Sequence, residues 1–543
     1  MGTAGLCDLP DDLLRHVLSF APAKEAAATA VLSRRWRSLW RTSGAVNLDS
    51  RSYGRPLSAG TREGFFRGAE AALAAAARGG PLRKLTLHVE LEAQHHHEIA
   101  AFLSHRGDGR GHDMVGAVLS NPAARRVEEL HVAAHVSGLL HLPGAFYELG
   151  SGALPSEALR VLHITNCGEL PPAPSPGGAA AFPLLAELWL RGGAVSFDRL
   201  RSMIHAAPQL ATLDLDCIYL DGEEGSHNGS PPRTPRYRLC CAAVTTLVVV
   251  DCTYPGWVQG GIELDAPRLR YLRFRGHVCL DRFSLKSHAL DLEQVDLHFV
   301  TGHVNRGEDR VRTRFWQFLQ NSNFNNTKIL RLKLEFPTDY IAIDQNEDWD
   351  ELLGSKLFRD LERLELEVTL YSNSNKASAF AMANLLHCCP VLCDLRLKLS
   401  MPSQSWRLSP SESRCVAETK AQLNFKESVD HFKHRNFLLD RVKDDSYEVS
   451  DIPGLSEHSF NCLENYLRRV SLQFRMERSN CFGTQLAKFF AENAMALEDM
   501  YIDDGNHRIC DHLIRKVETW SANSPKRRNL RTAKGFRILP QET

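Results

Sequence analysis

A short pattern of hydrophobic and polar positions returns along most of the chain. An apolar residue is followed by two variable residues, a second apolar residue, one variable residue and a third apolar residue. The copies are Leu82/Leu85/Leu87, Val127/Leu130/Val132, Leu159/Leu162/Ile164, Leu185/Leu188/Leu190, Leu210/Leu213/Leu215, Val244/Leu247/Val249, Leu269/Leu272/Phe274, Leu292/Val295/Leu297, Leu330/Leu332, Leu361/Leu364/Leu366, Leu392/Leu395/Leu397, Leu467/Val470/Leu472 and Leu497/Met500/Ile502. Alternation at the end of each copy predicts a strand with one buried face.

The spacing between copies decides how these strands are connected. Most neighbours are roughly 23 to 35 residues apart, which is close to the repeat length of leucine-rich repeats. Spacers such as 197–207 and 377–388 carry apolar residues at helical spacing. A β-sandwich would also use period-two strands, but helix-length spacers favour an α/β solenoid. We therefore predict a parallel sheet on the concave face and helices on the convex face.

Three polar stretches interrupt the repeats. Gly168–Ala181 and Asp221–Arg236 are predicted loops because they are rich in proline, glycine and serine. Residues 401–455 show no clear repeat and form the longest gap between strands. The segment 466–521 then predicts a strand, an amphipathic helix and a strand.

The first forty residues predict three short helices with more apolar surface than so small a unit buries alone. Pro10 suits a helix start, and Asp11 and Asp12 suit the positive end of its dipole. The motifs LPDDLLRHVLSF (9–20) and VLSRRWRSLW (31–40) closely resemble the F-box of plant F-box proteins. The alternative is a helical cap that covers the next domain.

That resemblance implies docking on a Skp-type adaptor. The residues expected to bind it are Leu9, Pro10, Leu13, Leu14, Val17, Leu18, Trp36, Leu39 and Trp40. The terminal segment is similar to the FBD domain of plant F-box/leucine-rich-repeat proteins. The predicted domains are an F-box (1–45), a linker with a first helical segment (46–81), the leucine-rich-repeat solenoid (82–400), an irregular insert (401–455), FBD-like terminal repeats (456–522) and a basic tail (523–543).

Composition narrows the classes of partner. The formal net charge is +0, so the basic bias of a general nucleic-acid or anionic-membrane binder is absent. The sequence has 14 cysteines, and no secretory apolar region precedes them. No apolar run in the sequence approaches the ~20 residues that a membrane-spanning helix needs. We expect reduced thiols in the nucleus or cytoplasm. The tail cations Lys526, Arg527 and Arg528 fit a nuclear-import patch or a solvated end.

No recognisable catalytic, cofactor or metal motif stands out. The glycine-rich stretch 107–111 fits neither a dinucleotide-binding nor a phosphate-binding loop. Two groups of possible metal ligands lack the paired spacing of structural zinc sites. They are the histidines at 88 and 95–97 and the set His507, Cys510 and His512. We therefore expect no enzyme activity, no cofactor and no metal.

The variable strand positions are expected to face the concave groove. They carry charges whose sign alternates between strands in the second half of the array. One interpretation is that neighbouring strands pair these charges and the face is simply solvated. The other is a target-binding groove with an apolar region and a basic half for an acidic segment. Its residues would be Trp189, Val248, Val250, Arg273, Arg275, Arg331 and Lys333.

Together these features predict the substrate-recognition subunit of an SCF-type (Skp/cullin/F-box) ubiquitin ligase. The F-box would hold the adaptor, and through it a cullin, while the solenoid holds a target protein. Two alternatives stay open: a protein-interaction scaffold outside ubiquitination, and a small-molecule co-receptor that uses the basic residues above.

Overall fold

A computed structural model describes residues 9–540, apart from 54–58, 93–113, 138–146, 150–153, 155–156, 172–180, 222–236, 254–261, 278–282, 287–288, 301–307, 323, 344–356, 370–374, 401–447, 475–480, 504–506 and 530–535. The loops predicted at Gly168–Ala181 and Asp221–Arg236, and the insert predicted at 401–455, lie largely outside the described residues. The chain divides into an N-terminal unit, Met1–Pro267, and a C-terminal unit, Arg268–Thr543.

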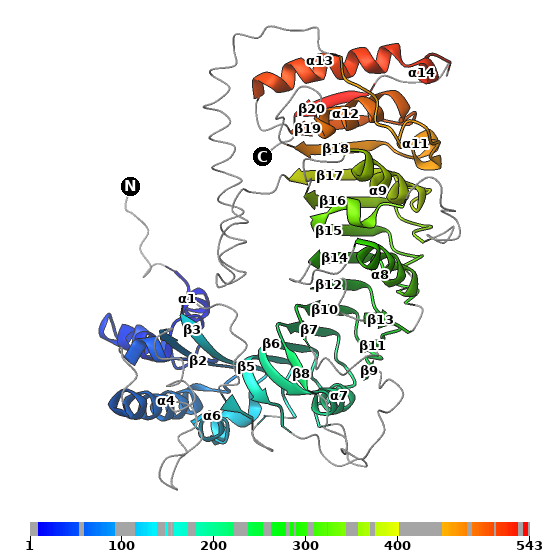
Figure 1. Ribbon diagram of the computed structural model, residues 1–543. Helices are drawn as coiled ribbons and strands as arrows, with labels where there is room; N and C mark the ends of the chain where they lie inside the picture. Colours follow the sequence, from blue (N-terminus) through cyan, green and yellow to red (C-terminus); the bar gives the residue numbers. More distant parts are fainter. Residues whose placement is uncertain are drawn as a thin grey trace, which may run out of the picture. The chain divides into compact units, whose positions relative to one another are not determined.

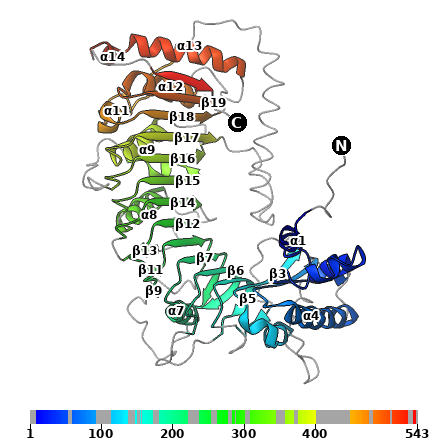
Figure 2. The same cartoon turned by 180° about the vertical axis from the view of Figure 1, so that it is seen from behind.

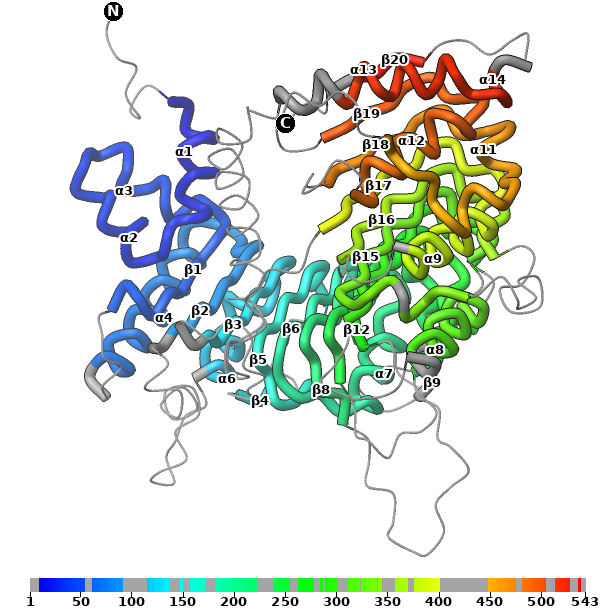
Figure 3. Tube along the Cα trace, turned by 45° about the horizontal axis from the view of Figure 1, so that its top comes forward, coloured from blue at the N-terminus to red at the C-terminus, as the bar shows by residue number. Residues whose placement is uncertain are grey.

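The N-terminal unit begins with three short α-helices and a 3-10 turn (Figure 3). These are α1 (Asp11–Leu18), α2 (Ala23–Ala28), η2 (Thr29–Val31) and α3 (Trp36–Leu39). Pro10 occupies the N-cap of α1, one position before the expected one, and Asp11 and Asp12 lie in its first turn. The segment is therefore helical, as predicted, and α2 runs directly into the 3-10 turn η2.

A parallel sheet follows in the same unit (Figure 1). Its strands, in spatial order, are β1 (Ala45–Asp49), β2 (Lys84–Glu92), β3 (Glu129–Ser137), β5 (Val161–Glu169), β6 (Glu187–Ser196), β7 (Thr212–Asp216) and β10 (Thr246–Val250). Short strands β4 (Tyr147–Glu148) and β8 (Tyr219–Asp221) pair with β5 and β6, and β9 (Tyr237–Cys240) pairs with β11 (Ile262–Asp265). The helical segments are η3 (Ser50–Tyr53), α4 (Ala59–Gly79), α6 (Met114–Leu119), η5 (Pro122–Arg126) and α7 (Phe197–Ala206).

Strand β1 corrects the predicted domain boundary. Residues 46–81 are predicted to hold a linker and a first helical segment. The helix is α4, but Val46 and Leu48 belong to a strand that pairs in register with Leu85 and Leu87 of β2. The repeat pattern does not reveal β1 because Ser43 stands where every copy except Leu330/Leu332 carries its first apolar residue. The sheet therefore starts directly after the N-terminal helices.

The repeats of the N-terminal unit turn at a shared corner. At this corner, four strand positions that are register partners of one another are each followed by a residue with a positive φ, between 46° and 63°. These residues are Asn166, Gly192, Cys217 and Asp251. A Cβ on Gly192 would lie 2.0 Å from the side-chain oxygen of Asn166. Glycine is therefore required at this corner both for its φ and for the close approach.

The C-terminal unit continues the same architecture, and its strands follow one another in chain order (Figure 2). They are β12 (Tyr271–His277), β14 (Gln294–Val300), β15 (Ile329–Pro337), β16 (Arg363–Thr369), β17 (Asp394–Ser400), β18 (Arg469–Phe474), β19 (Asp499–Asp503) and β20 (Arg537–Pro540), all paired in parallel. The other elements are β13 (Phe283–Leu285), α8 (Glu308–Asn321), η6 (Thr338–Ile341), α9 (Asn375–His387), α11 (Asn461–Asn465), α12 (Phe482–Asn493), α13 (His507–Asn523) and α14 (Pro525–Asn529).

Every predicted repeat copy forms a strand of one of the two units, and the predicted helices at 197–207 and 377–388 are α7 and α9. The segment 466–521 has the predicted strand–helix–strand order in β18, α12 and β19. The predicted tail 523–543 contains α14 and β20. The described end of the predicted insert, 448–455, has no helix or strand, and its Val449 carbonyl accepts a hydrogen bond from the Lys488 ammonium of α12 at 2.9 Å.

Candidate functional site

The helices of the predicted F-box enclose a small core of their own. Leu14, Leu18, Ala26, Trp36 and Leu39 are buried in it, and Leu9, Ala21 and Trp40 pack partly against it. Four residues expected to bind the adaptor, namely Leu14, Leu18, Trp36 and Leu39, are therefore used internally. Side chains with almost no exposure offer a partner no contact area. These four residues therefore support the exposed residues of the helices from inside the core.

Five other large apolar side chains of this segment are exposed. Leu13 and Val17 on α1 are each 51% exposed, Phe20 is 66%, Val31 87% and Leu32 65%. We call them the apolar surface residues. They account for five of the nine large exposed hydrophobic side chains in the described parts of the chain. The residues predicted from sequence to bind the adaptor include Leu13, Val17 and the exposed Pro10, but not Phe20, Val31 or Leu32.

The F-box is fixed to the first strand of the sheet. The side-chain amide of Asn47 on β1 donates to the carbonyls of Ser19 and Ala21, at 2.7 and 3.0 Å. The Lys24 ammonium donates to the Ser52 carbonyl at 2.7 Å and lies 4.6 Å from the ring centre of Tyr53. Helix α2 also packs against β1. The F-box therefore also caps this edge of the sheet, which repeat arrays need at their ends.

A row of aromatic rings crosses the variable face of the N-terminal sheet. His131, His163 and Trp189 are register neighbours on β3, β5 and β6. The ring centres of His131 and His163 are 4.2 Å apart, and those of His163 and Trp189 are 4.5 Å apart with planes at 26°. Burial, followed by the charge of His131, lowers the pKa of His163 to about 4. Its imidazole is therefore neutral near pH 7.

The variable face of the C-terminal sheet carries a ladder of ion pairs. Arg331 lies between two carboxylates, 3.7 Å from Asp296 and 2.8 Å from Glu365. Lys333 lies 3.4 Å from Glu367. On the next strand, Arg396 and Lys398 approach Glu365 and Glu367 at 3.5 and 3.2 Å. The alternating charges are thus paired between neighbouring strands, as in the first interpretation of the pattern.

The predicted groove residues fall into two groups. Trp189, Val248 and Val250 lie on the same face of the N-terminal sheet, and Asp214 on β7 lies between Trp189 and Val248 in the register. Arg273, Arg275, Arg331 and Lys333 belong to the C-terminal unit. Arg331 and Lys333 have carboxylate partners there, so an acidic ligand would have to displace them.

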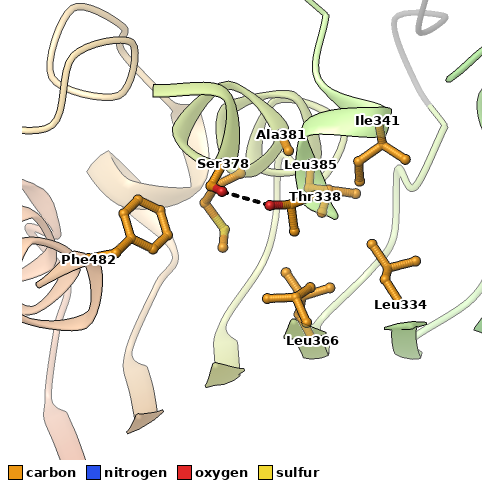
Figure 4. Close-up of a pocket in the computed structure, with 10 residues that line it drawn as sticks. Leu334, Thr338, Ile341, Leu366, Ser378, Ala381, Leu385 and Phe482 are labelled. Carbon is orange, nitrogen blue, oxygen red and sulfur yellow. Dashed lines mark hydrogen bonds between the residues drawn. The ribbon is translucent and has the colours of Figure 1, made fainter. Parts of the chain in front are cut away.

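A small cavity lies between sheet and helices in the C-terminal unit (Figure 4). Its volume is about 10 Å³, about the room that one water molecule needs, and it is lined by apolar residues of β15, η6, β16, α9 and α12, with two hydroxyl groups. These hydroxyls belong to Thr338 and Ser378 and hydrogen-bond to each other at 2.7 Å. Ligand pockets usually exceed about 300 Å³ and present polar groups to the ligand. This cavity therefore has the character of a packing defect.

The metal candidates receive no support in the described parts of the chain. No group of three His, Cys, Asp or Glu residues placed to hold a metal occurs among the described residues. His95–His97 lie outside them, and the side chains of His507, Cys510 and His512 are not described. No described helix is long and apolar enough to cross a membrane.

Comparison with known proteins gives the class of this chain. Residues 6–44 match the F-box domain, and residues 115–289 match the leucine-rich repeats of the FBD-associated F-box protein At5g56370. The chain thus has an F-box followed by a leucine-rich-repeat solenoid. Its repeats are of the type found in FBD-associated F-box proteins, a group with plant members.

Individual relatives agree with this assignment. The F-box/LRR-repeat protein At4g14096 of Arabidopsis thaliana is 26% identical over 355 residues, which cover 63% of this chain and 65% of that protein. The F-box protein At3g59000 of the same plant is 28% identical over 228 residues, 41% and 42% of the two chains. An FBD-associated F-box protein, At3g12840, is 60% identical over 47 residues, 9% of this chain and 25% of the relative. The chain spans less than two thirds of each of these relatives. The FBD-like segment at 456–522 stays a prediction.

Proposed function

We propose that this chain is the substrate-recognition subunit of an SCF-type ubiquitin ligase. Its F-box binds a Skp-type adaptor and, through it, a cullin, while its solenoid binds a target protein. The observation that carries the proposal is the set of apolar surface residues on the F-box: such a concentration of exposed large hydrophobic side chains marks a protein-binding surface.

The proposed role requires no chemistry from this chain. A subunit that holds adaptor and target together raises the local concentration of target lysines near the ubiquitin-loaded enzyme. The hydrogen bonds from Asn47 and Lys24 support a fixed geometry between the F-box and the first repeats. The target would therefore be presented in a defined orientation rather than on a flexible tether.

Within the solenoid, the N-terminal sheet offers the better target surface. Trp189 is 42% exposed there, and Val248 and Val250 are half-buried on the same face. In the C-terminal unit, Arg273 is exposed and contributes positive charge, whereas Arg331 and Lys333 are already paired. We therefore place the target contacts first at Trp189, Val248 and Val250.

The test is co-purification with a Skp-type adaptor. Deletion of the first fifty residues is unsuitable because it also removes β1 and uncovers the edge of β2. The double variant Val17→Ser, Leu32→Ser changes only exposed side chains, so the fold is expected to persist. Loss of anchors of this kind costs about 2 kcal/mol or more, which is about 30-fold in adaptor affinity.

The matched control is Leu290→Ser, since Leu290 is 71% exposed but lies in the C-terminal unit. It is expected to bind the adaptor normally. Equal adaptor binding by the control and the double variant would refute the proposed surface. A wild-type chain that binds no Skp-type adaptor would instead favour the scaffold alternative.

The small-molecule alternative gains no support from the cavity described above. It gains none from Arg331 and Lys333 either, because their charges are compensated by carboxylates.

A reducing compartment, the nucleus or the cytoplasm, suits the cysteines of this chain. Cys388 and Cys389 are free and buried, and burial raises the pKa of the Cys388 thiol to about 12. Fluorescence microscopy of the tagged full chain tests the location.

A further inference from the structure

The charge ladder on the C-terminal sheet is incomplete next to β17. Carboxylates and cations alternate from strand to strand up to β17, and β18 is the next strand in the sheet (Figure 1). Ser471 and Gln473 on β18 are the register partners of Arg396 and Lys398. A carboxylate at either position would continue the alternation, but neither residue carries a charge. Arg396 and Lys398 therefore have carboxylates beside them on β16 and none on β18.

The carboxylates in this part of the ladder are fewer than the cations. The variable face of β16, β17 and β18 holds three carboxylates, Glu365, Glu367 and Asp394, and four cations, Arg363, Arg396, Lys398 and Arg469. One oxygen of the buried Asp394, Oδ2, is shared by three arginines. It lies 3.0 Å from Arg363 and 3.5 Å from both Arg396 and Arg469. Hydrogen bonds from nitrogen donors are usually shorter than about 3.2 Å, so the two longer contacts are weak.

The two weakly bound arginines are also accessible. The side chains of Arg396 and Arg469 are 48% and 51% exposed. The other carboxylate near Arg396 is that of Glu365, which an arginine of β15 binds at 2.8 Å. On the other side, Asp499 is the register partner of Arg469, but its carboxylate is bound by Arg537 at 2.8 Å. The positive charge beside Ser471 is therefore only partly compensated.

We propose that Arg396 and Arg469 bind an aspartate or glutamate side chain of the target protein, which lies over Ser471. This inference rests on the proposed function, in which the solenoid binds the target. Guanidinium groups form short, charge-assisted hydrogen bonds with carboxylates. Parallel strands lie about 4.8 Å apart, and alternate residues of one strand about 6.6 Å apart, so both arginine side chains reach a carboxylate above Ser471. Tyr501 on β19 is the register partner of Ser471 and borders this position.

The rest of the ladder is less suited to an acidic side chain. Arg331 lies between two carboxylates, and Lys333 lies 3.4 and 4.0 Å from two others. An acidic group that approaches these cations meets like charges. Above Ser471 its neighbours in the register are Arg396 and Tyr501, neither of which is acidic. A target carboxylate at this position would continue the alternation of the ladder.

The experiment uses the full chain labelled with 3-fluorotyrosine and observed by fluorine NMR. Tyr501→Phe identifies the Tyr501 resonance among the 11 tyrosines. The probes are two tripeptide amides, acetyl-Gly-Glu-Gly and acetyl-Gly-Gln-Gly, which have nearly the same shape and differ by one charge. The Tyr501 resonance is expected to shift saturably with the glutamate probe. The glutamine probe is expected to bind about tenfold more weakly, the factor that corresponds to 1.4 kcal/mol.

Variants test the cations and the position. Arg469→Gln is expected to weaken binding of the glutamate probe about tenfold, with circular dichroism confirming the fold. If Arg469→Gln does not fold, Arg396→Gln replaces it. Ser471→Glu supplies the carboxylate from the chain itself and is expected to abolish probe binding, whereas Ser471→Gln has the same size and is expected to keep most of it. Arg515→Gln, on the exposed side of α13, is the matched control and leaves binding unchanged.

Four results would overturn the inference: no shift of the Tyr501 resonance with the glutamate probe, equal binding of the glutamine probe, full binding by a folded arginine variant, or equal effects of Ser471→Glu and Ser471→Gln. The proposed function is tested separately, by adaptor binding through the F-box. A chain that binds the glutamate probe but no adaptor would keep the site and lose the ligase assignment. A chain that binds the adaptor but not the probe would do the reverse.

Discussion

Leu364 lies on the buried face of β16, near the middle of the C-terminal sheet. It pairs in register with Leu330 on β15 and Leu395 on β17, and all three are fully buried. Leu364→Ala is expected to lower the free energy of unfolding by about 3 kcal/mol, through lost transfer energy and the cavity left behind. Leu364→Asp adds the cost of a carboxylate buried without a partner, so it is expected to unfold the adjacent repeats.

The next residue supplies the control. Glu365 lies on the opposite face, 2.8 Å from Arg331 and 3.5 Å from Arg396. Partly exposed pairs of this kind contribute about 0 to 1 kcal/mol each, so Glu365→Gln is expected to cost at most about 2 kcal/mol and less than Leu364→Ala.

Urea unfolding followed by circular dichroism measures both variants. For a slope of about 3 kcal/mol per molar, Leu364→Ala shifts the midpoint by about 1 M. Hydrogen exchange adds the location, because β15, β16 and β17 are expected to lose protection before β19. Equal costs for the two variants, or unchanged exchange in these strands, would show that β16 does not bury the face that contains Leu364.

The remaining predictions concern the two variable faces. Burial lowers the pKa of His163 to about 4, whereas an unfolded histidine titrates near 6.5. The unfolded chain therefore takes up its proton first, so the stability of the N-terminal unit is full above pH 6.5 and falls between pH 6.5 and about 4. His163→Phe keeps a ring in the row and is expected to reduce this fall in acid unfolding curves; an unaltered pH dependence would exclude His163 as a source. Arg331→Glu places a carboxylate between Asp296 and Glu365. It is expected to lower the urea midpoint without changing the partners captured from cell extract, and loss of those partners would assign Arg331 to the target site after all.

The repeat pattern by itself determined the architecture, because alternation and spacing are local properties of the chain. It failed at both ends. At β1, Ser43 replaces the first apolar residue of the pattern, and at β20, Gly535 does so. These strands are defined by their pairing with β2 and β19, whose backbone hydrogen bonds cannot be read from the local sequence.

The F-box shows what only the tertiary structure decided. Leu13 with Val17, and Leu14 with Leu18, are two rows with the same helical spacing on α1, and the sequence treats them alike. Packing against Trp36 and Leu39 buries the second row and leaves the first exposed. The same holds for the variable strand residues: the sequence gives their charges, but only the register places Arg331 between Asp296 and Glu365. Periodicity tells which residues share a face, whereas the element packed against that face decides whether it forms a core or a binding surface.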